Sequence, residues 1–225
     1  MLSGLRWLAL EVKYLDRARA FYTDHLGLAV AEETDEEVRL DAGAHELVLR
    51  RPSSVPRGGL HTHYAFAIPG EEYDDRWEAL EEAGFDLTEY SFGTARSLYL
   101  DDPDDHCVEL GERGEGNGIT RIFEIVLEVA DLDRAERFYT DLGFEPVDRG
   151  ANRERIRLAG PVDLELWEPH LGLADARGGV HVDVGFSADD PAEAVDRVGD
   201  RARSVETLDD GVRVLDPDGH YLTIR

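Results

Sequence analysis

The pattern of hydrophobic and polar positions near the N-terminus predicts a strand followed by a helix. In residues 7–12, Leu8, Leu10 and Val12 alternate with Trp7, Ala9 and Glu11, as in a half-buried strand. Residues 16–25 then place small and aromatic side chains at helical spacing, and Gly27 ends that helix. A second strand is predicted at 46–50, and it stops before Pro52.

The same pattern returns further along the chain. Residues 12–24 recur as residues 129–141 at a constant offset of 117, including the pair Phe-Tyr near the end of each segment. Two other segments are also duplicated, a Gly-Gly-x-His strand and an Asp-Pro-Asp-x-His turn, at 58–66 and 178–186 and at 102–106 and 216–220. Repetition of this size indicates a duplicated architecture.

Each repeat is a half-domain that begins with a strand, continues with an amphipathic helix and ends with two or three more strands. The four half-domains cover residues 1–52, 58–112, 119–169 and 178–225. A polar, glycine-rich linker at 113–118 divides them into a first pair, 1–112, and a second pair, 119–225.

Composition changes the picture of the environment. The chain has 50 acidic and 24 basic residues, a formal charge of −26, and Lys13 as its only lysine. Such a surface is tolerable where salt screens it, since the Debye length falls to roughly 3 Å at molar ionic strength. We therefore expect a cytoplasmic protein of a halophile. Cys107, the only cysteine, excludes an intramolecular disulfide and fits a reducing compartment.

The charge also bears on partners. Nucleic acid is not expected, because a polyanion needs a basic footprint and every arginine cluster here has acidic neighbours. A membrane is not expected either, because no apolar run approaches the roughly 20 residues of a spanning helix. Residues 1–10 lack the length and shape of a signal peptide. The oligomeric state is left open, with a homo-oligomer as one option.

Two repeated motifs resemble the vicinal oxygen chelate superfamily. One is the strand that leads into the Phe-Tyr helix, and the other is the Asp-Pro-Asp-x-His turn with the closing strand that follows it. That superfamily includes glyoxalase I, bleomycin and fosfomycin resistance proteins and extradiol dioxygenases. The resemblance covers nearly the whole chain. It implies an α+β fold in which four βαβββ-type half-domains, in two tandem pairs, form cupped mixed sheets with helices packed outside. It is specific for fold and not for reaction, because one fold hosts several chemistries.

The resemblance also implies two metal positions in each half-domain, one in its first strand and one in its last. The first-strand positions are, in chain order, Trp7, His63, Glu124 and Asp183. The last-strand positions are Val48, Glu109, Glu165 and Thr223. All four residues from halves two and three can bind a metal, whereas the four from halves one and four cannot make a site together. We therefore expect half two to pair with half three around one metal ion. Pairing one with two and three with four would split the donors.

Some of these assignments have alternatives. His61 lies two residues before His63 on the same strand face, and the register of the superfamily favours His63. Glu124 stands where the superfamily usually has histidine. Glu165 has the alternative of a solvated strand position. Tyr99 matches a tyrosine that extradiol enzymes place near the substrate hydroxyl, and its alternative is an ordinary strand aromatic.

The number of metal ligands separates the candidate reactions. Three donors from this set leave room for a catecholate and O₂ on Fe(II) or Mn(II), as in extradiol ring cleavage, with Tyr99 and Glu124 as catalytic candidates. Four donors suit a glyoxalase-like isomerisation on Ni, Zn or Co, in which Glu124 or Glu165 moves the proton. The histidine that ring-cleaving enzymes usually place before the tyrosine is Phe92 here, which weakens that reading.

A third hypothesis is a resistance-type protein that binds a small molecule without metal between Trp7, Phe92 and Tyr99. The order of half-domains, and the run 97–103 before Glu109, most resemble four-module catechol 2,3-dioxygenases. We therefore expect a ring-cleaving enzyme whose substrate is a small molecule with vicinal oxygens.

Overall fold

The computed structural model describes residues 1–52, 62–151, 155–169 and 182–225. The first half-domain contains β1 (Leu2–Glu11), α1 (Leu15–Ala20), a π-helical turn (Phe21–His25), β2 (Ala29–Glu33), β3 (Glu37–Ala42) and β4 (His45–Arg50). The second contains β5 (Thr62–Pro69), a 3₁₀ turn (Gly70–Glu72), α2 (Tyr73–Glu82), β6 (Thr88–Phe92), β7 (Ala95–Asp101) and β8 (Cys107–Gly114).

The later half-domains repeat this order. The third contains β9 (Arg121–Glu128), α3 (Leu132–Asp141), β10 (Glu145–Arg149), β11 (Arg155–Ala159) and β12 (Asp163–Trp167). The fourth contains β13 (Val182–Ala188), α4 (Pro191–Val198), β14 (Ser204–Leu208), β15 (Gly211–Leu215) and β16 (Tyr221–Ile224). None of the helices in the described part of the chain is long and apolar enough to cross a membrane.

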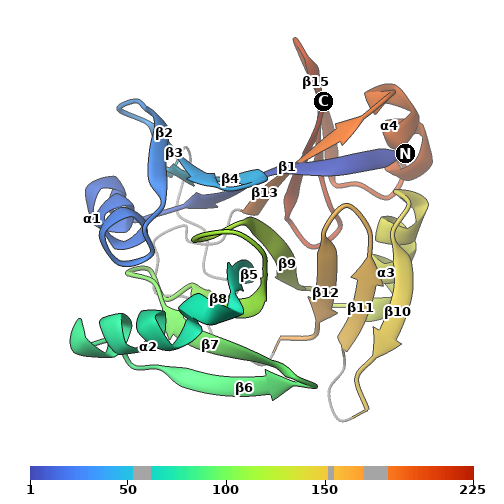
Figure 1. The fold of residues 1–225 in the computed structure, drawn as a ribbon. Coiled ribbons are helices and arrows are strands. Elements are labelled where there is room, and N and C mark those ends of the chain that lie inside the picture. The colour runs from blue at the N-terminus through green and yellow to red at the C-terminus, as the bar shows by residue number, and fades with distance from the viewer. Residues whose placement is uncertain (53–61, 152–154, 170–181) are drawn as a thin grey trace.

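The strands form two mixed eight-stranded sheets, which confirms the predicted α+β fold class. The terminal sheet joins the first and last half-domains in the order β14-β15-β16-β13-β1-β4-β3-β2. The central sheet joins the second and third in the order β10-β11-β12-β9-β5-β8-β7-β6. Figure 1 shows this division, with the blue and red ends of the chain in one sheet and the green and yellow middle in the other. Half two therefore pairs with half three, as the distribution of donors predicted.

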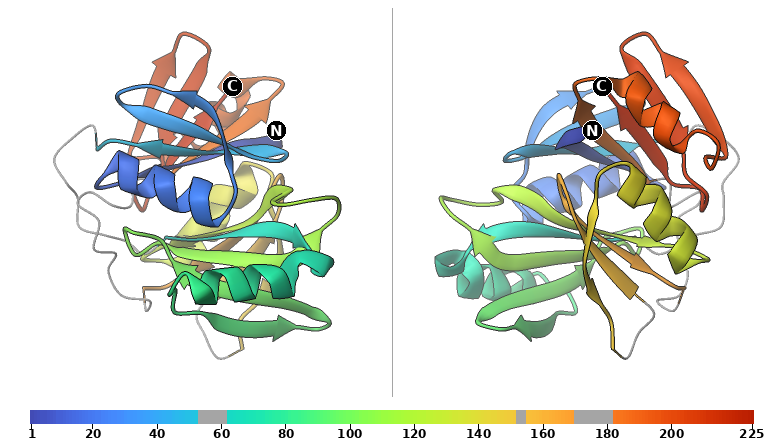
Figure 2. Two further views of the ribbon diagram at one scale, coloured as in Figure 1. Left: turned by 60° about the vertical axis from the view of Figure 1, so that its left-hand side comes forward. Right: turned by 90° about the vertical axis from the view of Figure 1, so that its right-hand side faces the viewer.

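Each sheet is continuous because the first strands of two half-domains pair antiparallel at its centre. β1 pairs with β13 in the terminal sheet, and β5 pairs with β9 in the central sheet. Figure 2 shows the two sheets one above the other. The predicted linker at 113–118 begins inside β8, which extends to Gly114. The division into units 1–112 and 119–225 stays a prediction.

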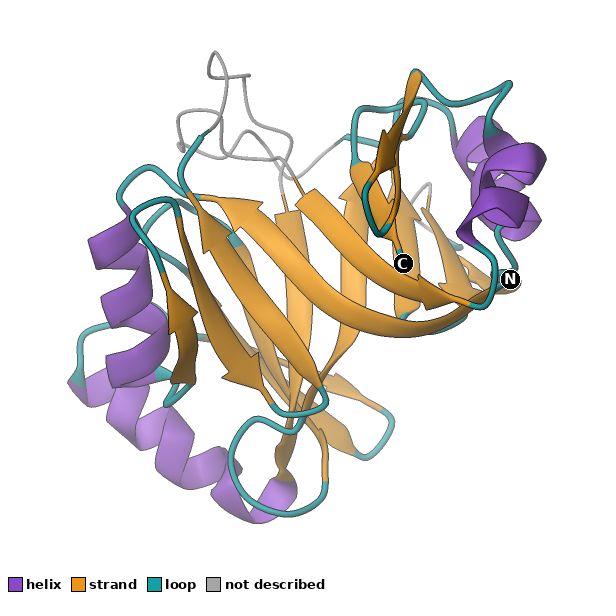
Figure 3. Ribbon diagram, turned by 90° about the horizontal axis from the view of Figure 1, so that it is seen from above, coloured by secondary structure: helices purple, strands orange, loops and turns teal. Residues whose placement is uncertain are grey.

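The two faces of the central sheet have different roles. Along β5, Tyr64, Phe66 and Ile68 are fully buried in a large apolar core that also takes in helices and strands of the terminal sheet. The residues between them, Ala65 and Ala67, belong to a separate small cluster on the opposite face. The helices flank the curved strands (Figure 3). Alternation along one strand thus separates the core face from the face that carries the polar candidates.

The repeated motifs of the sequence form buried polar joints in this core. The Asp102 carboxylate accepts the backbone N–H groups two and four residues further on, at 2.8 and 3.0 Å, and Asp216 accepts the corresponding groups at 2.9 and 2.8 Å. The tyrosine of each Phe-Tyr pair donates to the same carboxylates, Tyr22 to Asp102 at 2.6 Å and Tyr139 to Asp216 at 2.8 Å. These motifs therefore attach the helix of one half-domain to the turn of the next one along the chain, which is a structural role.

Candidate metal centre

Three neighbouring strands of the central sheet bring the candidate ligands into one row. Ala65 on β5 lies opposite Glu109 of the parallel strand β8 and opposite Glu124 of the antiparallel strand β9. His63 lies two residues before Ala65 and so projects from the same face. Because Ala65 has only a methyl side chain, the two carboxylates can approach each other across it.

The side chains of His63, Glu109 and Glu124 converge. Their potential ligand atoms all lie within 4.8 Å of one another. The three residues are only 7%, 3% and 6% exposed, and Nε2 of His63 lies 3.1 Å from Oε2 of Glu109. One imidazole and two carboxylates that converge in a buried place form a donor set that suits a divalent ion.

Glu165, the fourth predicted ligand, lies on β12 beside β9 and is buried, but its oxygens are engaged elsewhere. Oε1 accepts from Arg155 at 3.0 Å, and Oε2 accepts from the indole N–H of Trp167 at 2.8 Å. Within the described residues, the group with metal-binding geometry contains the other three predicted ligands and not Glu165. His61, the alternative to His63, lies outside the described residues.

The two carboxyl groups of the cluster differ in their electrostatics. Burial raises the pKa of Glu124 to about 7, helped by the charge of Glu165 and opposed by Arg157. Burial also acts on Glu109, but a hydrogen bond and the charge of His63 outweigh it and hold the Glu109 pKa below its usual value. Glu109 is therefore a carboxylate at neutral pH, whereas Glu124 exchanges its proton there.

Tyr99, a predicted catalytic residue, lies next to the cluster. It faces Glu109 across the β7–β8 ladder, and its ring centre lies 5.5 Å from that of His63. Burial and the Glu109 charge raise the Tyr99 pKa well above its ordinary value. Phe92 is 51% exposed, and Trp7 belongs to the terminal sheet. The three aromatic residues proposed to line a metal-free binding pocket therefore do not lie on the same sheet.

Comparison with known proteins places the chain in a family. A sequence model of the glyoxalase/bleomycin resistance protein/dioxygenase superfamily matches residues 4–110. The glutathione transferase FosA of Serratia marcescens is 30% identical over 114 residues, which cover 49% of this chain and 81% of that protein. The chain belongs to this superfamily.

A second relative of the superfamily spans nearly the whole chain. A catechol-2,3-dioxygenase of Bacillus subtilis strain 168 is 26% identical over 276 aligned positions, covering 98% of this chain and 96% of that protein. Solved structures show the same fold. A structure from B. subtilis strain 168 superimposes with a TM-score of 0.78 at 16% identity, covering 99% of this chain and 84% of that one. Glyoxalase I from Zea mays gives 0.70 at 20% identity, covering 98% and 91%.

The terminal sheet has the same superfamily topology without the donor cluster. Trp7, Ala9 and Val48 form an apolar cluster at the positions that His63, Ala65 and Glu109 occupy in the central sheet. Asp183 accepts from Arg50 and from the Thr223 hydroxyl, both at 2.7 Å. These four positions were predicted not to make a site, and the one metal-ligand group found among the described residues lies in the central sheet.

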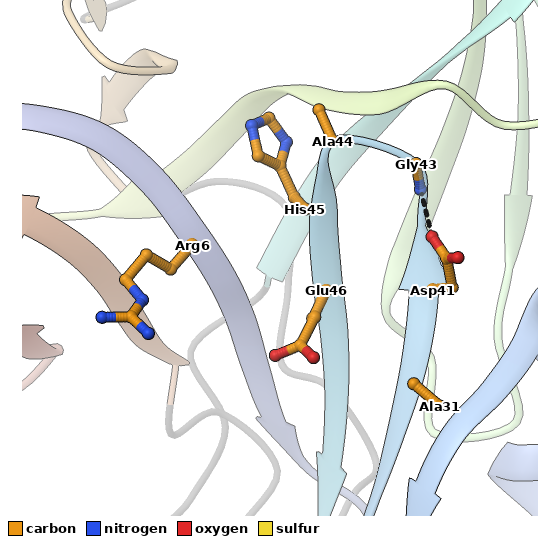
Figure 4. A pocket seen from close by; sticks show the side chains of 7 residues that line it. All are labelled: Arg6, Ala31, Asp41, Gly43, Ala44, His45 and Glu46. Atoms are coloured by element: carbon orange, nitrogen blue, oxygen red, sulfur yellow. Dashed lines mark hydrogen bonds between the residues drawn. The ribbon is translucent and has the colours of Figure 1, made fainter.

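A hollow of about 280 Å³ lies at the β3–β4 end of the terminal sheet (Figure 4). Its lining residues are Arg6, Ala31, Asp41, Gly43, Ala44, His45 and Glu46. Several of its polar groups serve the fold. Asp41 accepts the Gly43 N–H at 2.8 Å, and His45 Nδ1 accepts the Ile122 N–H of the central sheet at 3.1 Å. The hollow is therefore separate from the three converging donors.

The arginines that accompany the donors are not among the residues predicted from the sequence. Arg157 on β11 contacts Glu124 at 2.6 Å, Asp163 at 2.8 Å and Glu165 at 3.4 Å. The sequence contains a signal for them: Arg155 and Arg157 lie two residues apart, and so on one face, in the strand that precedes the one carrying Glu165. Recognising it requires the register of the β11–β12 ladder.

Proposed function

We propose that this chain is a divalent-metal-dependent enzyme that acts on a small molecule with two vicinal oxygens, and that its reaction is extradiol ring cleavage. The observation that carries the proposal is the convergence of His63, Glu109 and Glu124 while Glu165 is bound by other side chains. Three protein donors are the number in the facial triad of non-haem iron oxygenases, although one imidazole is replaced here by a carboxylate.

The donor chemistry fits such an ion. One imidazole and two carboxylates suit Fe(II) or Mn(II), and the two carboxylate charges would balance a divalent cation in a buried place. When bound, the ion would supply Lewis acidity and a point at which two adjacent substrate oxygens are held. His63, Glu109 and Glu124 would hold it.

The neighbouring residues have roles that follow from their positions. Tyr99 keeps its proton because its pKa is raised, so its hydroxyl is a hydrogen-bond donor beside the donor cluster. It faces Glu109 across the β7–β8 ladder and is placed to orient a substrate oxygen next to the cluster. Support for ring cleavage also comes from the relative named catechol-2,3-dioxygenase, which matches 98% of the chain.

A glyoxalase-type isomerisation on Ni, Zn or Co is the second candidate, and one observation favours it. Glu124 and Glu165 share Arg157, and burial together with the Glu165 charge brings the Glu124 pKa to about 7. A carboxyl group that titrates near neutral pH is suited to moving a proton between carbon and oxygen. For this reaction, Glu165 would have to join the ligand set or Glu124 would have to leave it.

The test measures metal and oxygen together. Protein purified anaerobically in high salt is analysed by mass spectrometry for bound metal, loaded with Fe(II), and given catechol in an oxygen electrode. We expect one Fe or Mn per chain and one O₂ consumed per catechol in wild type and in Asp183→Asn, and neither in Glu109→Gln. Metal retention without oxygen uptake, together with turnover of a hemithioacetal, would replace ring cleavage by isomerisation. Equal effects of both substitutions would overturn the site.

A further inference from the structure

Each last-strand position faces a residue of the preceding strand across an antiparallel ladder. The type of this facing residue differs in one half-domain. Val48, Glu165 and Thr223 each have an arginine opposite them, namely Arg39, Arg157 and Arg213. Glu109 has Tyr99 instead. The half-domain whose last-strand carboxylate joins the donor cluster is thus the one in which a neutral side chain replaces the arginine.

The contacts of Glu165 show what this arginine does. Arg157 approaches Oε1 of Glu165 at 3.4 Å, and Arg155 approaches the same oxygen at 3.0 Å. Trp167 donates to the other oxygen at 2.8 Å. Both oxygens of Glu165 are therefore engaged, and each would have to exchange a charge-assisted or indole hydrogen bond for a metal bond in order to become a ligand.

Arg157 also contacts the cluster itself. Its guanidinium lies 2.6 Å from Glu124 and is further anchored by Asp163 at 2.8 Å. The side chain is thus fixed between a carboxylate that belongs to the donor cluster and one that does not. An uncharged residue at this place, like Tyr99 in the second half-domain, would leave Glu165 without half of its cationic neighbours.

We propose that Arg157, together with Arg155, holds Glu165 as a non-ligand and so limits the metal centre to three protein donors. Arg157 is then a positioning residue that favours the three-donor chemistry over a four-donor centre. This inference rests on the proposed metal centre and adds a determinant of its reaction class. Charge balance supports it, since Glu109 and Glu124 already neutralise a divalent ion, and a third carboxylate needs its own cations.

The test uses Co(II) as a probe in anaerobic high-salt buffer, with affinity and the visible spectrum as readouts. The variants are Glu165→Gln, the double variant Arg155→Gln/Arg157→Gln, and the triple variant that adds Glu165→Gln to the double. We expect Glu165→Gln to match wild type in affinity and spectrum. The double variant should bind Co(II) roughly tenfold more tightly than the triple variant and show a changed spectrum, because Glu165 then joins the metal.

Matched controls separate the inference from its premise. Arg213→Gln makes the same change at the equivalent ladder position of the terminal sheet and should leave Co(II) binding unchanged. Glu109→Gln should lose Co(II), and if it does not, the proposed metal centre itself fails. Arg155→Gln/Arg157→Tyr, in which residue 157 copies the Tyr99–Glu109 pairing, replaces the double variant if circular dichroism shows that the latter does not fold.

Two results would overturn the inference while leaving the metal centre intact. One is a tenfold loss of Co(II) affinity in Glu165→Gln, which would make Glu165 a ligand of the wild-type centre. The other is equal affinity of the double and triple variants, which would mean that Glu165 does not bind when the arginines are removed.

Discussion

The central and terminal sheets share one topology and differ in what fills the same positions. Ala65 and Ala9 are equivalent, each opposite one residue of a parallel and one of an antiparallel neighbour. In the central sheet those two neighbours are glutamates that form the donor cluster. In the terminal sheet they are Val48 and Asp183, and Asp183 is bound by Arg50.

Trp7 explains why the terminal sheet has no room for an equivalent site. It occupies the position of His63, is 2% exposed, and faces Gly185 across the β1–β13 ladder. A Cβ atom at residue 185 would lie 2.2 Å from the indole ring, whereas Val126 occupies the equivalent position opposite His63. A duplicated fold thus lets one sheet keep polar donors while a large aromatic side chain fills the same face of the other.

The largest expected effect separates the donor sets of the two sheets. Glu109→Gln replaces a charged donor by a weak neutral one and should lower Fe(II) or Co(II) affinity by more than about 100-fold. Asp183→Asn, in the terminal sheet, should change it by less than about twofold. Metal titration followed by mass spectrometry checks both, and equal losses would contradict the assignment of the site to the central sheet.

The second prediction concerns the pH dependence of the metal-free protein. The Glu124 pKa of about 7 in the folded state exceeds the ordinary glutamate value of 4.5, so the folded chain binds an extra proton between these values. Glu124 therefore disfavours the folded state increasingly as pH rises from about 4.5 to 7, by at most about 3 kcal/mol. Denaturant titrations at several pH values should show that Glu124→Gln gains stability relative to wild type as the pH rises from about 4.5 to 7. An unchanged dependence would contradict the raised pKa.

A third prediction concerns the residue opposite Trp7, which is Gly185 in the terminal sheet and Val126 at the equivalent position of the central sheet. Gly185→Val introduces the central-sheet residue opposite Trp7 and should destabilise the protein by about 1–3 kcal/mol through overpacking. Adding Trp7→His to this variant should recover part of the loss, because the smaller ring makes room. Urea unfolding in high salt measures both, and a single variant as stable as wild type would show that Trp7 does not need the glycine.

The smallest expected effect compares the two repeated turns. Asp105 has a φ of 62°, in the left-handed region, whereas the equivalent residue of the second turn is Gly219 with a φ of 108°. Asp105→Gly removes the steric cost of that conformation and should stabilise the protein by about 0.5–1 kcal/mol. Thermal unfolding checks the direction. A loss of stability would mean that the Asp105 side chain contributes more than its backbone strain costs.

The alternation of side chains predicted most of the local structure. The first strand was expected at 7–12 and spans Leu2–Glu11, because alternation is clear only where one face is buried. The helix expected at 16–25 is α1 followed by a π-helical turn, Phe21–His25, which helical spacing alone does not distinguish from α-helix. Internal repetition added the number of half-domains.

The sequence by itself determined the superfamily fold, the pairing of half two with half three and the set of four candidate donors. Internal repetition defined the equivalent positions, and the resemblance to the superfamily implied the fold and which of those positions are candidate donors. Only the tertiary structure decided which donors converge. His63, Glu109 and Glu124 meet across Ala65, while Arg155 and Trp167 bind Glu165. That outcome depends on ladder register and on side-chain contacts between strands, and neither property is carried by the periodicity of a single strand.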